Sequence, residues 1–298
     1  MTARSRAVVD WDLEWEKAWK AHPSNPWFRY QADAYAAWLH VRAPQALART
    51  PRRILKTDAF EEACGFDPLR FALAARGYVL MDVSARILSH ARRWPSAAGP
   101  ACATDVRALA FRRAAFDLVV SPSTLDHFAD PRHIAVALRE IRRVLRPGGH
   151  LLVTLDNPAN PILRARRLVY RLTGPVGGLI PFPIGLTLSR ARLVAVLERE
   201  GLEVCASGYL LHMPRLLGLW LGEWAARGGH ARLAAGLCRL YGLLDRLLGA
   251  LPTRRWTGHF VVVDCRRPSR GGGSAVDSGT SATSSMIGLL HEGRLHAG

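Results

Sequence analysis

Short apolar runs alternate with amphipathic segments through the middle of this chain, and this alternation limits the fold more than any other feature. The apolar runs lie at residues 54–55, 78–81, 118–120, 151–155, 202–206 and 258–265. Amphipathic helices are expected between them, at about 68–76, 84–92, 132–145 and 189–200. Repeated strand–helix units place parallel strands in one sheet and cover both of its faces with helices. The sequence therefore predicts a doubly wound α/β domain.

The regions outside this pattern predict an arm, caps and a tail. Residues 1–48 are rich in tryptophan at helical spacing, and we expect an N-terminal helical arm there. Residues 49–267 would form the domain, with cap insertions at about 159–188 and 209–252 that interrupt the alternation. The Gly/Ser-rich stretch that begins at residue 268 predicts a disordered tail over 268–298.

The chain is strongly basic, with 41 Lys and Arg against 24 Asp and Glu and a net charge of +17. Such a charge is typical of proteins that bind nucleic acid or anionic membranes. The arginines are scattered and no nucleic-acid motif accompanies them, so we do not expect a nucleic-acid partner. A solvated basic surface is the favoured interpretation, and peripheral contact with a membrane is the alternative. The sequence predicts no oligomeric state.

The cysteines and the N-terminus bear on the compartment. The 5 cysteines are dispersed without the spacing of metal ligands, which is typical of reduced intracellular thiols. The N-terminus is polar and charged, which does not fit a secretory signal. We therefore expect a cytoplasmic protein.

Polar side chains follow the predicted strands at the edge where open α/β sheets bind ligands. Asp82 and Val83 follow the run at 78–81, and Ser121 follows the run at 118–120. An acid in the position of Asp82 can bind the two hydroxyls of a ribose. The alternative for this segment is a helix N-cap.

One family combines these residues in this order. Asp105 precedes Leu109-Ala110-Phe111, then Phe116-Asp117-Leu118-Val119-Val120-Ser121, then a helix that ends in Val144-Leu145-Arg146-Pro147-Gly148-Gly149. The set resembles the class I S-adenosylmethionine (SAM)-dependent methyltransferases of type 11, over roughly residues 50–155. The resemblance implies a Rossmann-like, mostly parallel, seven-stranded sheet and SAM as the cofactor.

The resemblance also implies roles for individual residues. Asp105 would contact the adenine amino group and Asp82 the ribose, with Val83 and Val106 beside them. Ser121 would line the methionine end of the cofactor.

The first loop departs from the family pattern of an acid followed by spaced glycines. It reads Lys56-Thr57-Asp58-Ala59-Phe60-Glu61-Glu62-Ala63-Cys64-Gly65. One interpretation is a helix start in which Asp58 and Glu61 form a capping box. The other is a cofactor loop made of Lys56, Asp58, Glu61 and Gly65. Its acids would repel a pyrophosphate but attract the sulfonium and ammonium groups of SAM.

Within the loop, two assignments stay open. Lys56 pairs either with the carboxylate of the cofactor or with Asp58. We expect Asp58 or Glu61 to bind the cofactor ammonium.

Two further clusters follow the fourth and fifth strands. Asp126 and His127 are the candidate catalytic residues, because a histidine can remove a proton from an acceptor near neutral pH. A helix cap or a supporting hydrogen bond is the alternative for His127. Asp156, Asn157 and Asn160 would orient the substrate, or form a turn stiffened by proline.

These features predict a methyltransferase that moves the methyl group of SAM to an oxygen or nitrogen atom of a small or lipid-like acceptor. We expect no metal ion. The alternative is a catalytically inactive relative of the same fold that acts as a binding module.

Overall fold

The computed structural model describes residues 11, 25–46, 53–66, 69, 78–93, 99–173, 185–227 and 231–269. Three expectations lie mostly or wholly outside these residues. They are the helix at 68–76, the first half of the arm, and the tail beyond residue 269. The middle of the first cap insertion, 174–184, also lies outside them.

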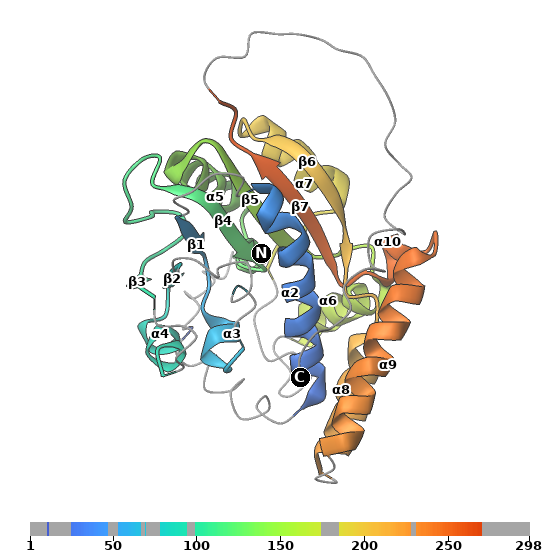
Figure 1. Cartoon of the computed structure of the whole chain (residues 1–298). Helices are drawn as coiled ribbons and strands as arrows, with labels where there is room; N and C mark the ends of the chain where they lie inside the picture. Colours follow the sequence, from blue (N-terminus) through green and yellow to red (C-terminus); the bar gives the residue numbers. More distant parts are fainter. Residues whose placement is uncertain are drawn as a thin grey trace. The chain divides into compact units, whose positions relative to one another are not determined.

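A sheet of seven strands forms the centre of the domain, in the order β3-β2-β1-β4-β5-β7-β6 (Figure 1). Strands β1 to β5 are parallel, and β7 runs antiparallel to both β5 and β6. This confirms the predicted Rossmann-like α/β fold with a mostly parallel sheet. The strands are β1 Ile54–Lys56, β2 Val79–Asp82, β3 Ala101–Ala103, β4 Phe116–Pro122, β5 Leu145–Asp156, β6 Glu203–Leu210 and β7 Phe260–Arg266.

Strand β3 has no counterpart among the predicted apolar runs. It is short, lies at the edge of the sheet and keeps all of its side chains at least partly exposed. Its sequence, Ala-Cys-Ala, is three small residues long, which is too short to show a strand pattern.

Helices cover both faces of the sheet, as predicted. One core contains Val119 and Val153 with Ile134 of α5 and Leu193 of α7. The core on the other face contains Leu39 of α2. The helices are α2 Pro26–Ala46, α3 Phe60–Ala63, α4 Ala85–Ala91, α5 Pro131–Val144, α6 Pro161–Thr173, α7 Arg190–Arg199, α8 Arg215–Arg227, α9 Ala231–Ala250 and α10 Arg254–Thr257, with a 3₁₀ turn η2 at Leu125–His127.

Local sequence signals place the starts of two helices. The hydroxyl of Ser84 accepts a hydrogen bond from the backbone N–H of Ile87 and caps α4. Asp130 accepts from the N–H of Arg132, and Pro131 occupies the first turn of α5. Ser84 is thus the cap of the helix after β2, and Asp82 is not.

Helices α2, α8 and α9 pack together through small residues and aromatic rings. A side chain at Gly218 would clash with the ring of Trp27, since a Cβ there would lie 1.9 Å from a ring carbon. The hydroxyl of Tyr241 donates to the carbonyl of Gly218 over 2.9 Å. The α8–α9 pair follows β6, which extends to Leu210 (Figure 1).

Candidate functional site

The carboxyl ends of β1 and β4 are joined by hydroxyl groups. Thr57 Oγ1 donates to Ser121 Oγ over 3.0 Å and lies 2.9 Å from Thr124 Oγ1. Ser121 is completely buried. The structure therefore brings the first loop and the β4 end together at the edge where parallel strands end.

Lys56 lies inside a cluster of carboxylates in the first loop. Its Nζ is 2.6 Å from Glu61 Oε2, 2.7 Å from Glu62 Oε2 and 3.4 Å from Asp58 Oδ1. The side chains of Lys56 and Glu62 are fully buried, whereas Asp58 and Glu61 keep 18% and 19% of theirs exposed. The lysine holds the acids of the loop, and its ammonium does not reach the surface.

Three carboxyl groups share the single cation of Lys56 in this cluster. Burial raises the pKa of Glu62 to about 7, against the opposing effect of Lys56. Burial also raises the pKa of Asp58 well above its usual range. Asp58 Oδ2 is buried and has no hydrogen-bond partner among the described residues. The cluster is therefore suited to an additional cation.

The capping box predicted for this loop does not form. The N-cap of α3 is Ala59, and Glu61 bonds to Lys56. Asp58 Oδ1 accepts from the N–H of Phe60, two residues on. A buried lysine attracts the Glu61 carboxylate more strongly than a backbone N–H does, so the local motif gives way.

Asp82 connects the end of β2 to the first loop. Its Oδ2 accepts from the N–H of Ala59 over 3.0 Å, and its Oδ1 accepts from the N–H of Ser84 over 2.9 Å. Each carboxylate oxygen has a second lone pair for a ribose hydroxyl. The neighbouring Val83 is 53% exposed, an apolar surface beside the carboxylate.

Asp105 is bound by an arginine two residues further on. Arg107 Nε lies 3.0 Å from both carboxylate oxygens of Asp105, and its guanidinium stacks over the ring of Phe128. This pairing lowers the pKa of Asp105 despite partial burial. Val106 is buried beneath it. Asp105 stays ionised and partly exposed, so an amino group competes for it with Arg107.

Asp126 and His127 form the η2 turn after β4. Asp126 Oδ2 accepts from the N–H of Asp156 over 2.9 Å, and its Oδ1 is buried without a partner among the described residues. Burial, and then the charge of Asp156, raise the pKa of Asp126 well above its usual range. The ring of His127 contacts Trp11 edge-on, with centroids 4.6 Å apart. Burial therefore favours the protonated form of Asp126, which lies next to a histidine in the chain.

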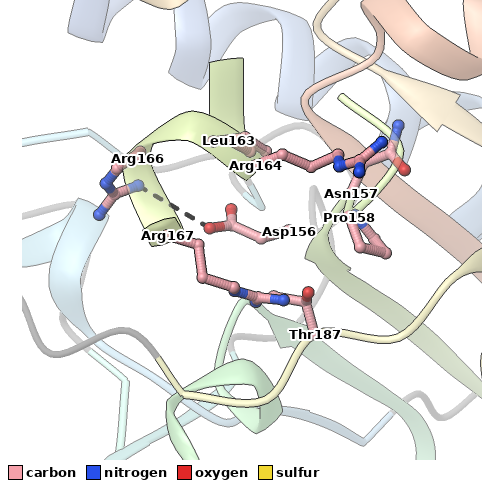
Figure 2. Close-up of a pocket in the computed structure, with 8 residues that line it drawn as sticks. All are labelled: Asp156, Asn157, Pro158, Leu163, Arg164, Arg166, Arg167 and Thr187. Atoms are coloured by element: carbon pink, nitrogen blue, oxygen red, sulfur yellow. Dashed lines mark ion pairs between the residues drawn. The ribbon is translucent and has the colours of Figure 1, made fainter. Parts of the chain in front are cut away.

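The end of β5 opens into a small cavity with a volume of about 20 Å³ (Figure 2). Its lining consists of Asp156, Asn157, Pro158, Leu163, Arg164, Arg166, Arg167 and Thr187. Asp156 lies 3.8 Å from Arg166 Nη1 and 3.6 Å from His259 Nε2. Of the three predicted substrate residues, Asp156 has a carboxylate that faces this cavity.

The amides of Asn157 and Asn160 are occupied by backbone groups. Asn157 Nδ2 donates to the carbonyls of Arg255 and Gly258, and Asn160 Nδ2 donates to those of Thr257 and Gly258. Asn160 Oδ1 also accepts from the first N–H groups of α6. These contacts give both residues a structural role, and their predicted contact with substrate stays a prediction.

The match to a known family concerns the region from the end of the first loop to β5. Residues 60–153 match the family model described as "Methyltransferase domain". This match and the fold support the predicted class I SAM-dependent methyltransferase. The match begins at Phe60, immediately after the part of the first loop that lacks the glycines.

Solved structures are similar to this chain at low sequence identity. A candidate sarcosine dimethylglycine methyltransferase from Galdieria sulphuraria has a TM-score of 0.52 at 12% identity, covering 78% of this chain and 85% of that one. A SAM-dependent methyltransferase from Mesorhizobium loti scores 0.46 at 20% identity, with 79% and 100% covered. The N-methyltransferase NodS from Bradyrhizobium japonicum WM9 scores 0.46 at 15%, with 81% and 98% covered. No curated protein matches this chain.

The residues present fit the charge of SAM. Asp58 and Glu61 are the accessible acids of the cluster around Lys56, and Asp58 has a buried oxygen without a partner in the described part of the chain. They would hold the ammonium, and Asp82 would hold the ribose. The cofactor supplies a methyl group activated on a sulfonium.

Sequence reasoning missed three groups of this methyltransferase. Arg107 occupies Asp105, and Arg166 and Thr187 line the cavity. The basic run at 164–167 was the available signal for the cavity, because a charged run after a strand end often marks a ligand site.

Replacing the accessible acids tests the ammonium site. We expect Asp58→Asn or Glu61→Gln to weaken SAM binding about tenfold, since a charge-assisted hydrogen bond contributes roughly 1.5–3 kcal/mol. Isothermal titration of SAM measures this. Glu203→Gln, at a carboxylate exposed in an ion pair with Arg266, is the control and should leave the Kd unchanged. Unchanged affinity in both loop variants would contradict the assignment.

Proposed function

We propose that the methyltransferase moves the methyl group of SAM to an oxygen or nitrogen atom of a lipid-like acceptor, which it takes from an anionic membrane surface. The observation that carries this proposal is the exposed apolar surface of α8 and α9. The catalytic step is assigned to the η2 turn and the acceptor to the cavity at the end of β5.

Each of the two helices has an exposed apolar stripe. On α8, Trp220 and Trp224 are 66% and 60% exposed, and their side lies away from Gly218 and Gly222, which pack against Trp27 and Asn25. The exposed apolar residues of both helices are Leu216, Leu217, Trp220, Trp224, Leu240, Leu243 and Leu247. Large exposed apolar sets on soluble domains mark contacts with proteins or membranes.

Basic residues border the same stripes and favour an anionic membrane. Arg227, Arg232, Arg239 and Arg246 are all exposed on these helices. Tryptophan and arginine side by side are typical of helices that lie in the interface of a bilayer. Among the described residues no helix is long and apolar enough to cross a membrane. The stripes would therefore lie on the bilayer surface.

The η2 turn supplies the groups for proton transfer. Methyl transfer from a sulfonium needs chiefly alignment of the two reacting atoms, and a base only where the acceptor loses a proton. His127 is our proposed base, and Asp126 would stay protonated beside it. Asp156 is the group of the β5 end nearest to this turn, through the hydrogen bond from its N–H to Asp126.

The competing function is a binding module that does not transfer methyl groups. The observation in its favour is that Lys56 and Arg107 already neutralise acids that the cofactor would need. SAM titration separates the two functions, because a binding module of this kind would not bind SAM at millimolar concentration.

A vesicle experiment tests the membrane surface. The full chain should co-sediment with vesicles of equal parts phosphatidylcholine and phosphatidylglycerol, and much less with phosphatidylcholine alone. We expect the double variant Trp220→Ser/Trp224→Ser to reduce binding at least tenfold, because about 1.4 kcal/mol of lost burial gives that factor.

Val41→Ser removes an apolar side chain of α2 that is 51% exposed and serves as the matched control. It should leave vesicle binding unchanged. Equal binding of wild type and double variant would overturn the surface. A mass in light scattering that doubles in wild type and not in the double variant would instead assign the stripes to a second copy of the chain.

A further inference from the structure

The cavity at the end of β5 contains more positive charge than its carboxylate can offset. Three guanidinium groups line it, those of Arg164, Arg166 and Arg167, against the single carboxylate of Asp156. Arg166 is 3.8 Å from that carboxylate, and Arg167 donates to the carbonyl of Gly185 over a long 3.4 Å. Among the described residues, none of these three guanidinium groups forms a short, bidentate ion pair with a carboxylate.

A further arginine faces the same carboxylate from α8. Arg215 Nη1 lies 3.5 Å from His259 Nε2, and Asp156 Oδ1 lies 3.6 Å from that same nitrogen. Burial and the nearby charge of Arg166 lower the pKa of Arg215 to about 10. Burial lowers the pKa of His259 to about 4, so this histidine is neutral at pH 7. The groups around Asp156 therefore add up to an excess of positive charge.

Two polar atoms of the cavity lining lack partners. Thr187 is 9% exposed, and its hydroxyl is buried without a hydrogen bond among the described residues. The Nε of Arg166 is also buried and has no partner within the described ranges. A buried hydroxyl and a buried guanidinium N–H each cost free energy unless something accepts from them. Figure 2 shows the guanidinium of Arg167 beside Thr187.

We propose that this cavity is an anion subsite that binds a phosphate or carboxylate group of the methyl acceptor. Both groups accept hydrogen bonds from several donors at once, and guanidinium forks match their planar arrays of oxygen atoms. Arg167 and Thr187 would donate from one side of the cavity and Arg166 from the other (Figure 2). The inference rests on the proposed function, since it assigns the polar part of the acceptor.

The position of the cavity fits an acceptor rather than the cofactor. Its carboxylate, Asp156, is bonded through the backbone to Asp126 of the η2 turn. The acids proposed for SAM belong to the first loop and to β2 and do not line this cavity. An anion held here would lie next to the proposed base and would leave the cofactor residues free.

Titration of the full chain with inorganic phosphate, followed by calorimetry, tests the subsite without SAM or any acceptor. We expect binding to wild type that weakens about tenfold in Arg166→Gln and severalfold in Thr187→Val. The control is Arg171→Gln, at an exposed arginine one turn further along α6, which should bind phosphate as wild type does.

Thr187→Val also separates binding from folding. Valine has nearly the same shape and removes a buried hydroxyl without a partner, so the free variant should be at least as stable as wild type. Weaker phosphate binding without loss of thermal stability would support the subsite. Equal phosphate affinity in wild type and both cavity variants, or none in wild type, would overturn it.

The source of the anion is distinguished by the probe. Glycerol 3-phosphate represents the headgroup of a phospholipid, and acetate represents a carboxylic acid. The subsite should bind more tightly the probe whose anion the acceptor carries. None of these anion titrations contains SAM or membranes. A negative result in them therefore does not affect the vesicle experiment or the SAM titration. A failure of those experiments would equally leave phosphate binding intact.

Discussion

Lys56→Met should lower the free energy of unfolding by roughly 3–5 kcal/mol at pH 7, because it removes the single cation among buried carboxylates. Lys56 is fully buried and contacts Glu61 and Glu62 at 2.6 and 2.7 Å. Without it, the buried carboxylate of Glu62 loses its cation and keeps the hydroxyl of Tyr78 as a neutral donor. Urea unfolding followed by fluorescence measures the change. The loss should shrink at acid pH, where the carboxyls are protonated and need no counter-ion.

The control for this prediction is an ion pair of the same type on the surface. Arg227 lies 3.2 Å from Glu223, with side chains 79% and 49% exposed, so Arg227→Met should cost at most about 1 kcal/mol. Adding Glu62→Gln to Lys56→Met should restore part of the lost stability, and this double variant keeps the test usable where the single one does not fold. Equal losses in Lys56→Met and Arg227→Met would contradict the buried cluster.

Asp82→Asn should weaken SAM binding by roughly 10- to 100-fold, because hydrogen bonds to a charged group contribute roughly 1.5–3 kcal/mol each. The carboxylate accepts backbone N–H groups from Ala59 and Ser84 with separate oxygens. An asparagine keeps one acceptor oxygen and turns an NH₂ group toward the other N–H. The variant therefore loses the charge for the ribose and one tether of the first loop, and isothermal titration measures the result.

A variant of a second aspartate distinguishes weaker SAM binding from a general loss of stability. Asp117, at the opposite end of β4, also accepts a backbone N–H, that of Arg53, and bonds to Arg146. Asp117→Asn should lower thermal stability and leave the SAM affinity unchanged. Wild-type SAM affinity in a folded Asp82→Asn protein would remove Asp82 from the cofactor site.

Much of the fold could be predicted from local and periodic signals. The alternation of apolar runs and amphipathic segments indicates the parallel core strands and the helices on both faces, because burial on both faces requires apolar runs. Ser84 and the pair Asp130-Pro131 place the starts of α4 and α5 through contacts within one turn. The parallel arrangement then brings the ends of β1, β2, β4 and β5 to one edge, which locates the site.

The partners of the site residues were decided by the tertiary structure. From the sequence, Lys56 could pair with the cofactor or with Asp58, and the fold buries it against Asp58 and both glutamates. Asn157 bonds to carbonyls about 100 positions away, at Arg255 and Gly258, where no local pattern could place it.

The sequence by itself therefore determined the α/β sheet, its helical faces and the edge that carries the acids. Only the tertiary structure decided which acidic and basic side chains pair with each other, and which part of the site has more groups of one charge than of the other. Periodicity and caps are set by neighbours within a few residues, so they can be read along the chain. Burial of Lys56, or of the hydroxyl of Thr187, depends on segments far apart in sequence, and it fixes both pairing and pKa only once the chain has folded.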